Sequence, residues 1–447
     1  MTFPTMTPST LFSTILATSV ATASVATTFG SSPATADDTA GAAQQRMAET
    51  AAKTEAAYLI GPSVASKLGC EIVWQSTVAL PPGIGLKLVS ATPAATLALN
   101  ERNEVTFLRS ATGDSAWTAS AALAIDHVDA MGVLDDRFGD RGGHVAIFTD
   151  TQLYLLDETN GELAKKSSYR HAPSTLPVLA NEYVIFGSRN GQLVFVNAHT
   201  GFLFRSSVVD PVSRAPGSIA ARPATNGGVV VVGSSTGTVA AYDSSSAQSI
   251  WRRELLAGVV ASPAISGNTV FVACEDQYLY AFDLGNGDTL WKYFTQTPLR
   301  TAPFVAGNMV LQEIPGEGLV AFTANPEGQI GGEVRWKKTG IDGKPISTAV
   351  SAGRDSVVFW CPKHRRVSYV DLLKGDIIAQ VDLPKVQHLE ADRLDVGGFV
   401  AWSADGRIER LAPVKTAPVA VAPASAPAAP TTEASTDAGS EESASNG

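Results

Sequence analysis

The sequence predicts an all-β fold, an eight-bladed β-propeller of four-stranded antiparallel blades. First, a strand motif recurs eight times between residues 70 and 413. Second, the copies lie about 43 residues apart, the length that four strands and their turns require. Third, the 447 residues include 39 Gly and 25 Pro but only 17% charged residues, a composition that suits short strands and turns better than long charged helices.

The third strand of each copy shows the repeat most clearly. Aligned on "YLYAFD", the position of Asp283 recurs at Arg109, Asp157, Asn197, Asp243, Thr323, Asp371 and Ala412. Along the chain the spacings are 48, 40, 46, 40, 40, 48 and 41. Their mean of about 43 is the length of one propeller blade, so one repeated unit accounts for the whole region.

The other strands of a copy follow the same order. The first is rich in small residues and Pro, as in "VVASPAIS", which fits an innermost strand crowded around a central channel. The second is a continuous apolar run, as in "TVFVAC", and is expected to be buried on both faces between neighbouring blades.

A turn and an aromatic residue complete the repeat. Asp or Asn at the end of the third strand can accept hydrogen bonds from amides two or three residues on, and Gly four residues later supplies the positive φ that closes the hairpin. The acidic members are Asp157, Asp243, Asp283 and Asp371, and the glycines are Gly113, Gly161, Gly201, Gly287 and Gly375. Four residues beyond, or after a longer loop in the sixth copy, stands a tryptophan: Trp117, Trp251, Trp291 and Trp336.

We interpret these tryptophans as structural. A ring on an outer strand can bury roughly 150–250 Å² against the next blade, which accounts for its recurrence without any catalytic role. Copies two, three and seven carry Lys165, Arg205 and Ala379 at this position instead.

The eighth copy lacks its outer strand, and the N-terminal segment is predicted to supply it. "CEIVWQSTVAL" (residues 70–80) contains Trp74 and precedes the first complete blade. Paired beside "GRIERLAP", it would join the two ends of the ring and remove the exposed strand edges of an open array.

The segments outside the propeller differ from it in composition. Residues 1–36 are apolar and small, and Ala34, Thr35 and Ala36 have the form of an export cleavage site, although no basic residue precedes Arg46. Residues 37–69 are predicted to be a linker and one helix over 42–60, ending at Gly61 and Pro62. Residues 414–447 are rich in Ala, Pro, Ser, Thr and Glu and are expected to be disordered.

The net charge and the cysteine content restrict the classes of partner and site that the chain can have. A net charge of −10 disfavours nucleic-acid partners. The basic run Lys363–Arg366 is interpreted as a solvated hairpin tip. The three cysteines, Cys70, Cys274 and Cys361, are too far apart in the sequence for a metal motif. Cys274 and Cys361, near the ends of second strands two blades apart, are expected to be buried free thiols.

A search for chemistry in the sequence finds one weak candidate. Asp135, Asp136, Asp140 and His144 occupy a Gly-rich connection, but they lack the alternating spacing and terminal Glu of a calcium loop. The six histidines show no zinc-binding spacing, and no nucleophile elbow or phosphate-binding loop is present. We therefore expect no catalytic, cofactor-binding or metal-binding residues.

The pattern Ala281, Asp283, Gly287 and Trp291, repeated more loosely in the other copies, resembles that of the PQQ-like β-propeller superfamily. The resemblance covers residues 70–413. Within that superfamily, the chain resembles the BamB-like non-catalytic propellers most in size and layout. Resemblance to the quinoprotein dehydrogenases of the superfamily would imply a bound quinone, a cation held by acidic and amide side chains, a catalytic Asp and often a disulfide between adjacent cysteines. This chain has no adjacent cysteines.

These observations favour a non-catalytic, exported propeller that is periplasmic or envelope-associated. It would be a monomer that binds protein partners in envelope or outer-membrane protein assembly. The alternatives are a PQQ- and Ca²⁺-dependent quinoprotein dehydrogenase and a carbohydrate-binding propeller. Candidate interaction surfaces are the insertion at 323–336 and the helix around 46–59.

Overall fold

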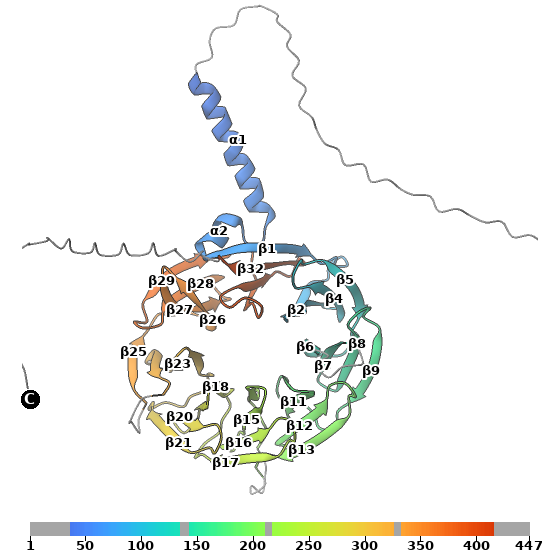
Figure 1. The fold of residues 1–447 in the computed structure, drawn as a ribbon, viewed down its shortest axis with the longest axis vertical. Coiled ribbons are helices and arrows are strands. Elements are labelled where there is room, and N and C mark those ends of the chain that lie inside the picture. The colour runs from blue at the N-terminus through green and yellow to red at the C-terminus, as the bar shows by residue number, and fades with distance from the viewer. Residues whose placement is uncertain (1–35, 135–142, 211–216, 326–331, 415–447) are drawn as a thin grey trace, which may run out of the picture. The chain divides into compact units, whose positions relative to one another are not determined.

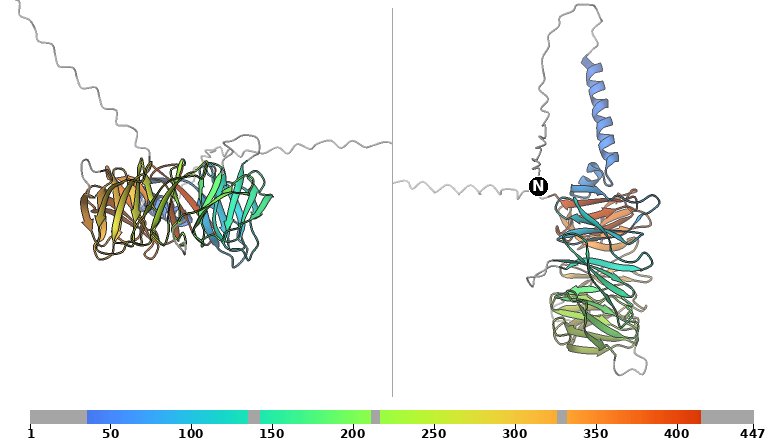
Figure 2. Two further views of the ribbon diagram at one scale, coloured as in Figure 1. Left: turned by 90° about the horizontal axis from the view of Figure 1, so that it is seen from below. Right: turned by 90° about the vertical axis from the view of Figure 1, so that its right-hand side faces the viewer.

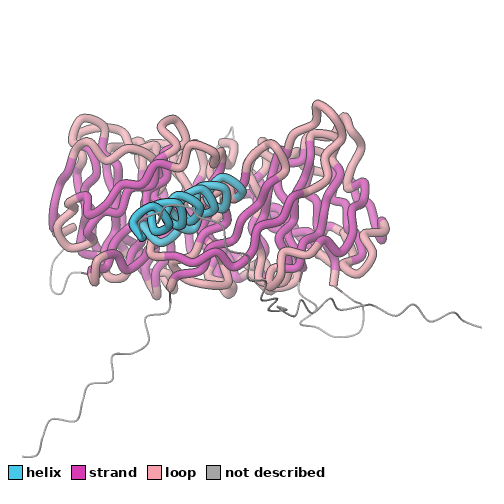
Figure 3. The backbone as a smooth tube through the Cα atoms, turned by 90° about the horizontal axis from the view of Figure 1, so that it is seen from above, coloured by secondary structure: helices cyan, strands magenta, loops and turns pink. Residues whose placement is uncertain are grey.

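A computed structural model describes residues 36–134, 143–210, 217–325 and 332–414. The chain divides into two compact units, residues 1–53 and 54–447. The first contains most of helix α1 (Ala36–Ala57), and the second contains the last turn of α1, helix α2 (Pro62–Lys67) and all the strands. Strands make up nearly all the regular structure of the second unit (Figure 3).

The strands form eight sheets, each of four antiparallel strands, as predicted. The sheets of blades one to four are, from first to fourth strand, β2 (Leu86–Ala91), β3 (Ala95–Asn100), β4 (Glu104–Arg109) and β5 (Ser115–Ser120); β6 (Val128–Leu134), β7 (His144–Thr149), β8 (Gln152–Asp157) and β9 (Leu163–Ser168); β10 (Val178–Ala180), β11 (Tyr183–Gly187), β12 (Gln192–Asn197) and β13 (Leu203–Val208); β14 (Ala224–Thr225), β15 (Val229–Gly233), β16 (Thr238–Asp243) and β17 (Ser249–Glu254).

Blades five to eight follow the same pattern, with the last completed by the first strand of the chain. Their strands are β18 (Ala264–Ser266), β19 (Thr269–Ala273), β20 (Tyr278–Asp283) and β21 (Thr289–Phe294); β22 (Phe304–Ala306), β23 (Met309–Ile314), β24 (Gly318–Thr323) and β25 (Val334–Lys338); β26 (Lys344–Ser351), β27 (Arg354–Cys361), β28 (Arg366–Asp371) and β29 (Ile377–Asp382); β30 (His388–Ala391), β31 (Phe399–Trp402), β32 (Arg407–Pro413) and β1 (Cys70–Thr77).

The blades stand around a central channel. First strands such as β2, β6 and β26 face the middle of the ring, and fourth strands such as β9, β13 and β17 form its rim (Figure 1). Seen from the edge, the strands run between the two faces of the ring (Figure 2). Each connection from a fourth strand to the next first strand therefore crosses the same face.

The core lies between adjacent blades. Strands β3, β11 and β19 are buried along their whole length, as their continuous apolar sequences predict. One buried cluster, for example, joins Val231 of blade four to Val270 and Phe282 of blade five. Burial on both faces of each sheet explains why the second and third strands do not alternate apolar and polar residues.

The ring closes as the sequence predicts. β1 pairs antiparallel with β32, with Cys70 opposite Pro413 and Ser76 opposite Ile408. The N-terminal strand is thus the fourth strand of blade eight, and this pairing covers an edge that would otherwise be exposed.

The helical region differs from the single helix expected over 42–60. α1 ends at Ala57, and a second helix, α2, begins at Pro62. Pro62 occupies the first turn of α2, where the missing amide of proline costs nothing, so the proline that was expected to end a helix instead begins one.

No helix within the described ranges is long and apolar enough to cross a lipid bilayer. The predicted export segment up to Thr35 and the predicted disordered tail from Lys415 lie outside the described residues.

Candidate functional site

The rim tryptophans all make the same contact with the following blade. Each indole Nε1 donates to the carbonyl of the residue that follows the Asp283-equivalent position. The donor–acceptor distances are 2.8 Å for Trp74 to Ser110, 2.8 Å for Trp117 to Glu158, 2.7 Å for Trp251 to Leu284, 2.9 Å for Trp291 to Ala324 and 2.9 Å for Trp336 to Leu372. We call each such indole position a tryptophan slot.

A glycine lies beneath each indole. A Cβ on Gly113, Gly161, Gly287 or Gly375 would lie 2.5–2.6 Å from the ring of Trp74, Trp117, Trp251 or Trp336. The same four glycines have φ of +73° to +76°. The glycine is therefore required both by the turn and by the ring on top of it. Beneath Trp291 the glycine is Gly332, which the repeat alignment did not identify because a longer loop precedes it.

The Asp and Asn side chains at the ends of third strands organise these turns. Asp283 Oδ1 accepts from the amides of Gly285 (2.8 Å) and Asn286 (3.1 Å). Equivalent bonds form at Asp157, Asn197, Asp243 and Asp371. At Asp243, hydrogen bonds from Ser245 and Ser246 lower the pKa to about 2, so this carboxylate stays charged and acts as a fixed acceptor.

The centre of the ring holds a cavity of about 720 Å³, the channel cavity, lined by residues of the inner strands and their connections. Its charged lining residues are Asp129, Arg222, Glu390 and Arg393. Sequence reasoning missed all four, because isolated charges in or next to the first strands of blades two, four and eight carry no local pattern. The two cations and two carboxylates balance, so this cavity suits a polar ligand or peptide better than a polyanion.

Burial shifts the titration of these groups. Loss of hydration raises the pKa of Glu390, while the positive charge of Arg393 opposes the shift. Loss of hydration also raises the pKa of Asp129, which lies 3.4 Å from His127 Nε2. The Arg222 guanidinium donates to the Pro177 carbonyl (3.0 Å), and both burial and the like charge of Arg393 lower its pKa.

The described residues were compared with the cation site that a quinoprotein would need. Within residues 36–134, 143–210, 217–325 and 332–414, no three His, Cys, Asp or Glu side chains lie close enough together to hold a metal ion. The three cysteines are free and buried, as expected for Cys274 and Cys361, and none lines the cavity. The weak metal candidate Asp135, Asp136 and Asp140 lies outside the described residues, and His144 begins β7.

Cys361 is the one thiol close to a base. Its sulfur lies 3.5 Å from His364 Nδ1, and the same nitrogen lies 3.7 Å from Asp342. A nucleophile triad needs the base to contact nucleophile and carboxylate through different nitrogens, so this arrangement does not form one. The run Lys363–Arg366 forms the turn between β27 and β28, which is the hairpin tip that was predicted.

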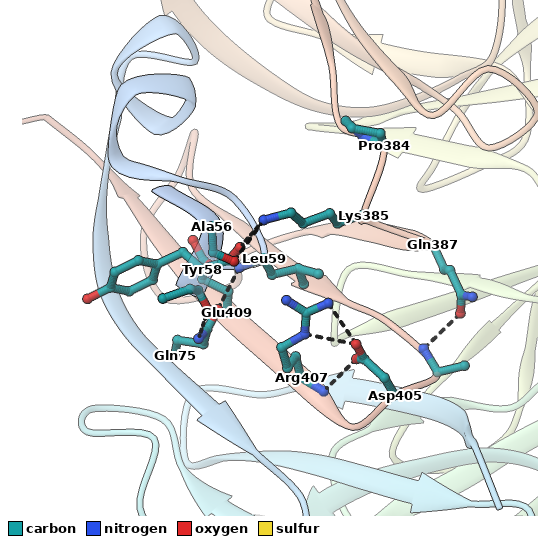
Figure 4. A network of polar contacts seen from close by, with 12 residues as sticks. Ala56, Tyr58, Leu59, Gln75, Pro384, Lys385, Gln387, Asp405, Arg407 and Glu409 are labelled. Carbon is teal, nitrogen blue, oxygen red and sulfur yellow. Dashed lines mark hydrogen bonds and ion pairs between the residues drawn. The ribbon is translucent and has the colours of Figure 1, made fainter. Parts of the chain in front are cut away.

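A polar network holds the N-terminal segment against blade eight (Figure 4). The buried Glu409 of β32 accepts a hydrogen bond from the Ile60 amide (2.9 Å), and Gln75 of β1 accepts one from the Leu59 amide (2.6 Å). Lys385 Nζ donates to the Ala56 and Tyr58 carbonyls, both at 3.0 Å, and so caps the end of α1. Sequence analysis missed this network because the contacts of Glu409 and Lys385 join residues more than 300 positions apart in the chain.

The geometry defines a class of protein: an eight-bladed propeller with indole-on-glycine contacts between its blades. A family sequence model, described as outer membrane protein assembly factor BamB, matches residues 66–293 and 205–357. The chain therefore belongs to the BamB family. Among curated proteins none matches it significantly.

Solved structures share the fold at low sequence identity. BamB from Moraxella catarrhalis has a TM-score of 0.54 and 18% identity, and the alignment covers 76% of this chain and 98% of that one. The computationally designed Ika8 protein gives 0.52 and 15%, with 74% and 96% covered. The C-terminal WD40 domain of Sif2 gives 0.53 and 10%, with 77% and 98% covered. These similarities establish the propeller fold. They say nothing of function, because the sequence identities are low.

Proposed function

We propose that this protein is an exported, non-catalytic propeller that binds other proteins during assembly of the outer membrane. The observation that carries the proposal is the match to the outer membrane protein assembly factor BamB over residues 66–357. The complete, closed ring supports it, because a rigid propeller presents loops at its two faces for partners. The protein would act as a monomer in the periplasm or at the envelope.

One face of the ring offers apolar contact points. Ile125 and Leu123, in the connection between blades one and two, are 90% and 53% exposed, and Leu256, between blades four and five, is 92% exposed. All three lie in fourth-to-first connections and therefore on the same face. Large apolar side chains that remain this exposed are suited to a protein partner.

Deletion of the gene in its native host tests the proposal. We expect the amount of folded β-barrel proteins in the outer membrane to fall by at least twofold relative to the total envelope protein, measured by quantitative mass spectrometry. Expression of the full chain should restore it. Unchanged levels of every outer-membrane barrel protein would overturn the assembly role. A protein that stays inside the cell with residues 1–36 uncleaved would overturn export.

The loop face gives a sharper test of how the protein acts. The double variant Ile125→Asp and Leu256→Asp should fail to restore barrel levels although it folds, since both side chains are solvent-exposed. The matched control Leu290→Asp changes a 40%-exposed leucine on the rim strand β21 and should restore them. Appearance of dye-linked alcohol oxidation after addition of PQQ and Ca²⁺ to purified protein would instead favour the quinoprotein alternative.

A further inference from the structure

Three blades lack a rim tryptophan, and the three tryptophan slots that result differ in what occupies them. Strand pairing confirms that the substitutes occupy the tryptophan position: Lys165 pairs with Leu155, Arg205 with Phe195 and Ala379 with Tyr369. In blade five, Trp291 pairs with Ala281, which occupies the same position of the third strand as Leu155, Phe195 and Tyr369. The question is what fills the space that the indole occupies in the other blades.

Two of the three slots are closed from within the chain. Next to Ala379, the segment leading into α2 packs on blade seven: Leu59, Ile60 and Leu68 share one buried cluster with Tyr369, whose hydroxyl donates to the Leu68 carbonyl (2.9 Å). Beyond Arg205, the glycine of the turn is replaced by Ala247, which is buried and has φ of +53°. A side chain therefore already occupies the floor of that slot.

The slot between blades two and three holds no aromatic ring. Its turn keeps the glycine, Gly201, with φ of +65°, and the side chains of Ser167 and Lys165 lie over it, with Ser167 Oγ 2.3 Å and Lys165 Cδ 3.6 Å from the position of an added Cβ. A cavity of about 440 Å³ lies here, which we call the rim groove. Its walls include Lys165, Lys166 and Arg170 of blade two and Phe202 and Leu203 of blade three. That volume lies within the range of sites that bury small ligands or single side chains.

The groove also keeps the polar partner that an indole would use. In the five occupied slots the carbonyl that follows the Asp283-equivalent position accepts the indole N–H. The equivalent carbonyl here is that of Ala198, and no hydrogen bond to it is found among the described residues. The glycine, the acceptor and an adjoining cavity are thus present without the aromatic ring, and an entering indole would displace the Ser167 and Lys165 side chains from Gly201.

The chemistry of the walls indicates what would enter. Three cations line the groove, and none of its described lining residues is acidic. The Lys165 ammonium lies 3.9 Å from the centroid of the Phe202 ring, and Phe202 is 67% exposed. An aromatic side chain could stack on Phe202 and displace Lys165, while neighbouring carboxylates pair with the three cations.

We infer that the rim groove binds an acidic segment of a partner protein and takes one aromatic side chain from it into the tryptophan slot over Gly201. The inference rests on the proposed function only in that the occupant is a protein. The chain's own acidic C-terminal segment is a poorer candidate, because residues 414–447 contain no Phe, Tyr or Trp.

A peptide pair tests the inference on the full mature chain. The probe is a fluorescein-labelled peptide of sequence DEWED, and its partner peptide has the tryptophan replaced by alanine. Fluorescence anisotropy should show saturable binding of the first peptide, at least tenfold weaker binding of the second, and weakening of both with added salt. Equal binding of the two peptides, or no binding of the first, would overturn the inference.

The variant Lys165→Trp gives the clearest test. It should be more stable than the natural chain, so that a loss of peptide binding could not be caused by misfolding. Its own indole would fill the slot over Gly201, raise the thermal unfolding midpoint and weaken DEWED binding at least tenfold. The matched control Arg205→Trp places the same ring over Ala247, where the floor is blocked, and should leave peptide binding within twofold. Wild-type affinity in Lys165→Trp would contradict the inference.

Two further results separate the possible occupants. A chain ending at Val414 should bind DEWED with unchanged affinity; a tenfold gain would show that the chain's own tail occupies the groove and would overturn the partner assignment. Lys165→Trp is also expressed in the deletion host. Loss of peptide binding with normal outer-membrane barrel levels would support the groove as a binding site and show that barrel assembly does not use it, whereas the proposed function itself fails only if gene deletion leaves barrel levels unchanged.

Discussion

Trp74 and Arg410 are paired across the strands that close the ring, and both donate to the same carbonyl, that of Ser110 in blade one. The distances are 2.8 Å from the indole Nε1 and 3.2 Å from the guanidinium Nη1. Arg410 also binds Asp392 (2.7 Å) and Asp395 (2.6 Å) of blade eight. One residue pair thus links the first and last strands of the chain to the first complete blade.

Removal of Arg410 should weaken this closure. The side chains of Arg410 and Asp392 are 7% and 3% exposed, so Arg410→Ala leaves a buried carboxylate without its cation. Breaking one partner of a buried pair costs about 3–5 kcal/mol, and we expect a correspondingly lower urea midpoint. Arg366→Ala removes a pair of similar geometry, to Asp382 at 2.6 Å, that is 41% and 63% exposed, and should cost at most about 1 kcal/mol. Equal midpoints for the two variants would contradict this account of closure.

The glycine beneath each indole should be more sensitive to substitution than its backbone conformation alone explains. Gly287 has φ of +75°, and an added Cβ would lie 2.5 Å from the Trp251 ring. Gly353 has φ of +71° but no atom within 4 Å of an added Cβ. Gly353→Ala should lose roughly 1–2 kcal/mol from backbone strain, and Gly287→Ala a further ~1–3 kcal/mol from overpacking.

Chemical denaturation with tryptophan fluorescence measures both glycine variants. The fluorescence of Gly287→Ala should also change in the native state, because the Trp251 ring must move away from the added methyl. If the two alanine variants are equally stable, the indole contact adds nothing to the requirement for glycine.

The architecture could be predicted from the sequence because its determinants are local and repeated. The turn at Asp283 and Gly287 and the apolar run before it reappear at a nearly constant spacing, so each copy supports the next. Closure by residues 70–80 followed from counting strands. By contrast, the helix starting at Pro62 was missed, since a proline can end one helix or begin another and only packing against blade seven decides between them.

The sites were harder to predict, for a physical reason. Arg222, before the first strand of blade four, approaches Glu390 and Arg393 of blade eight only because the blades close into a ring. Within "RIERLAP", Glu409 and Arg410 look like an ordinary polar pair, yet both are buried, with partners at Ile60 and Ser110. The substitution of tryptophan by Lys165 was visible in the repeat, but its consequence depends on Gly201 in the next blade.

The thiols should report the integrity of blades five, seven and eight. Burial raises the pKa of the Cys70 and Cys274 thiols to about 12, so at pH 8 almost no thiolate is present at either. We expect neither residue to react with Ellman's reagent in the native state, and both to react in 6 M guanidinium. Cys361, at 8% exposure and 3.5 Å from His364, should react first as the protein opens. Rapid native labelling of Cys274 would contradict the buried geometry.

The burial of Glu409 should make stability depend on pH. Burial raises the pKa of Glu409 from 4.5 to about 7, although the Ile60 and Leu59 amides and the charges of Lys385 and Arg407 oppose the shift. Between these two values the folded protein keeps the proton and the unfolded chain releases it. The contribution of Glu409 to the free energy of unfolding is therefore complete below pH 4.5 and is lost as pH rises through about 7.

A neutral substitute isolates this effect from the other titrating groups. Glu409→Gln can keep the carbonyl that accepts from Ile60 and cannot ionise, so the stability of the natural chain relative to the variant should fall by roughly 2–3 kcal/mol between pH 4.5 and pH 8. Urea unfolding midpoints at half-unit pH steps measure the difference. Glu162→Gln, at an exposed position, controls for loss of one negative charge. A constant difference in the free energy of unfolding between the Glu409→Gln variant and the natural chain would mean that burial does not raise the pKa of Glu409 in the folded protein.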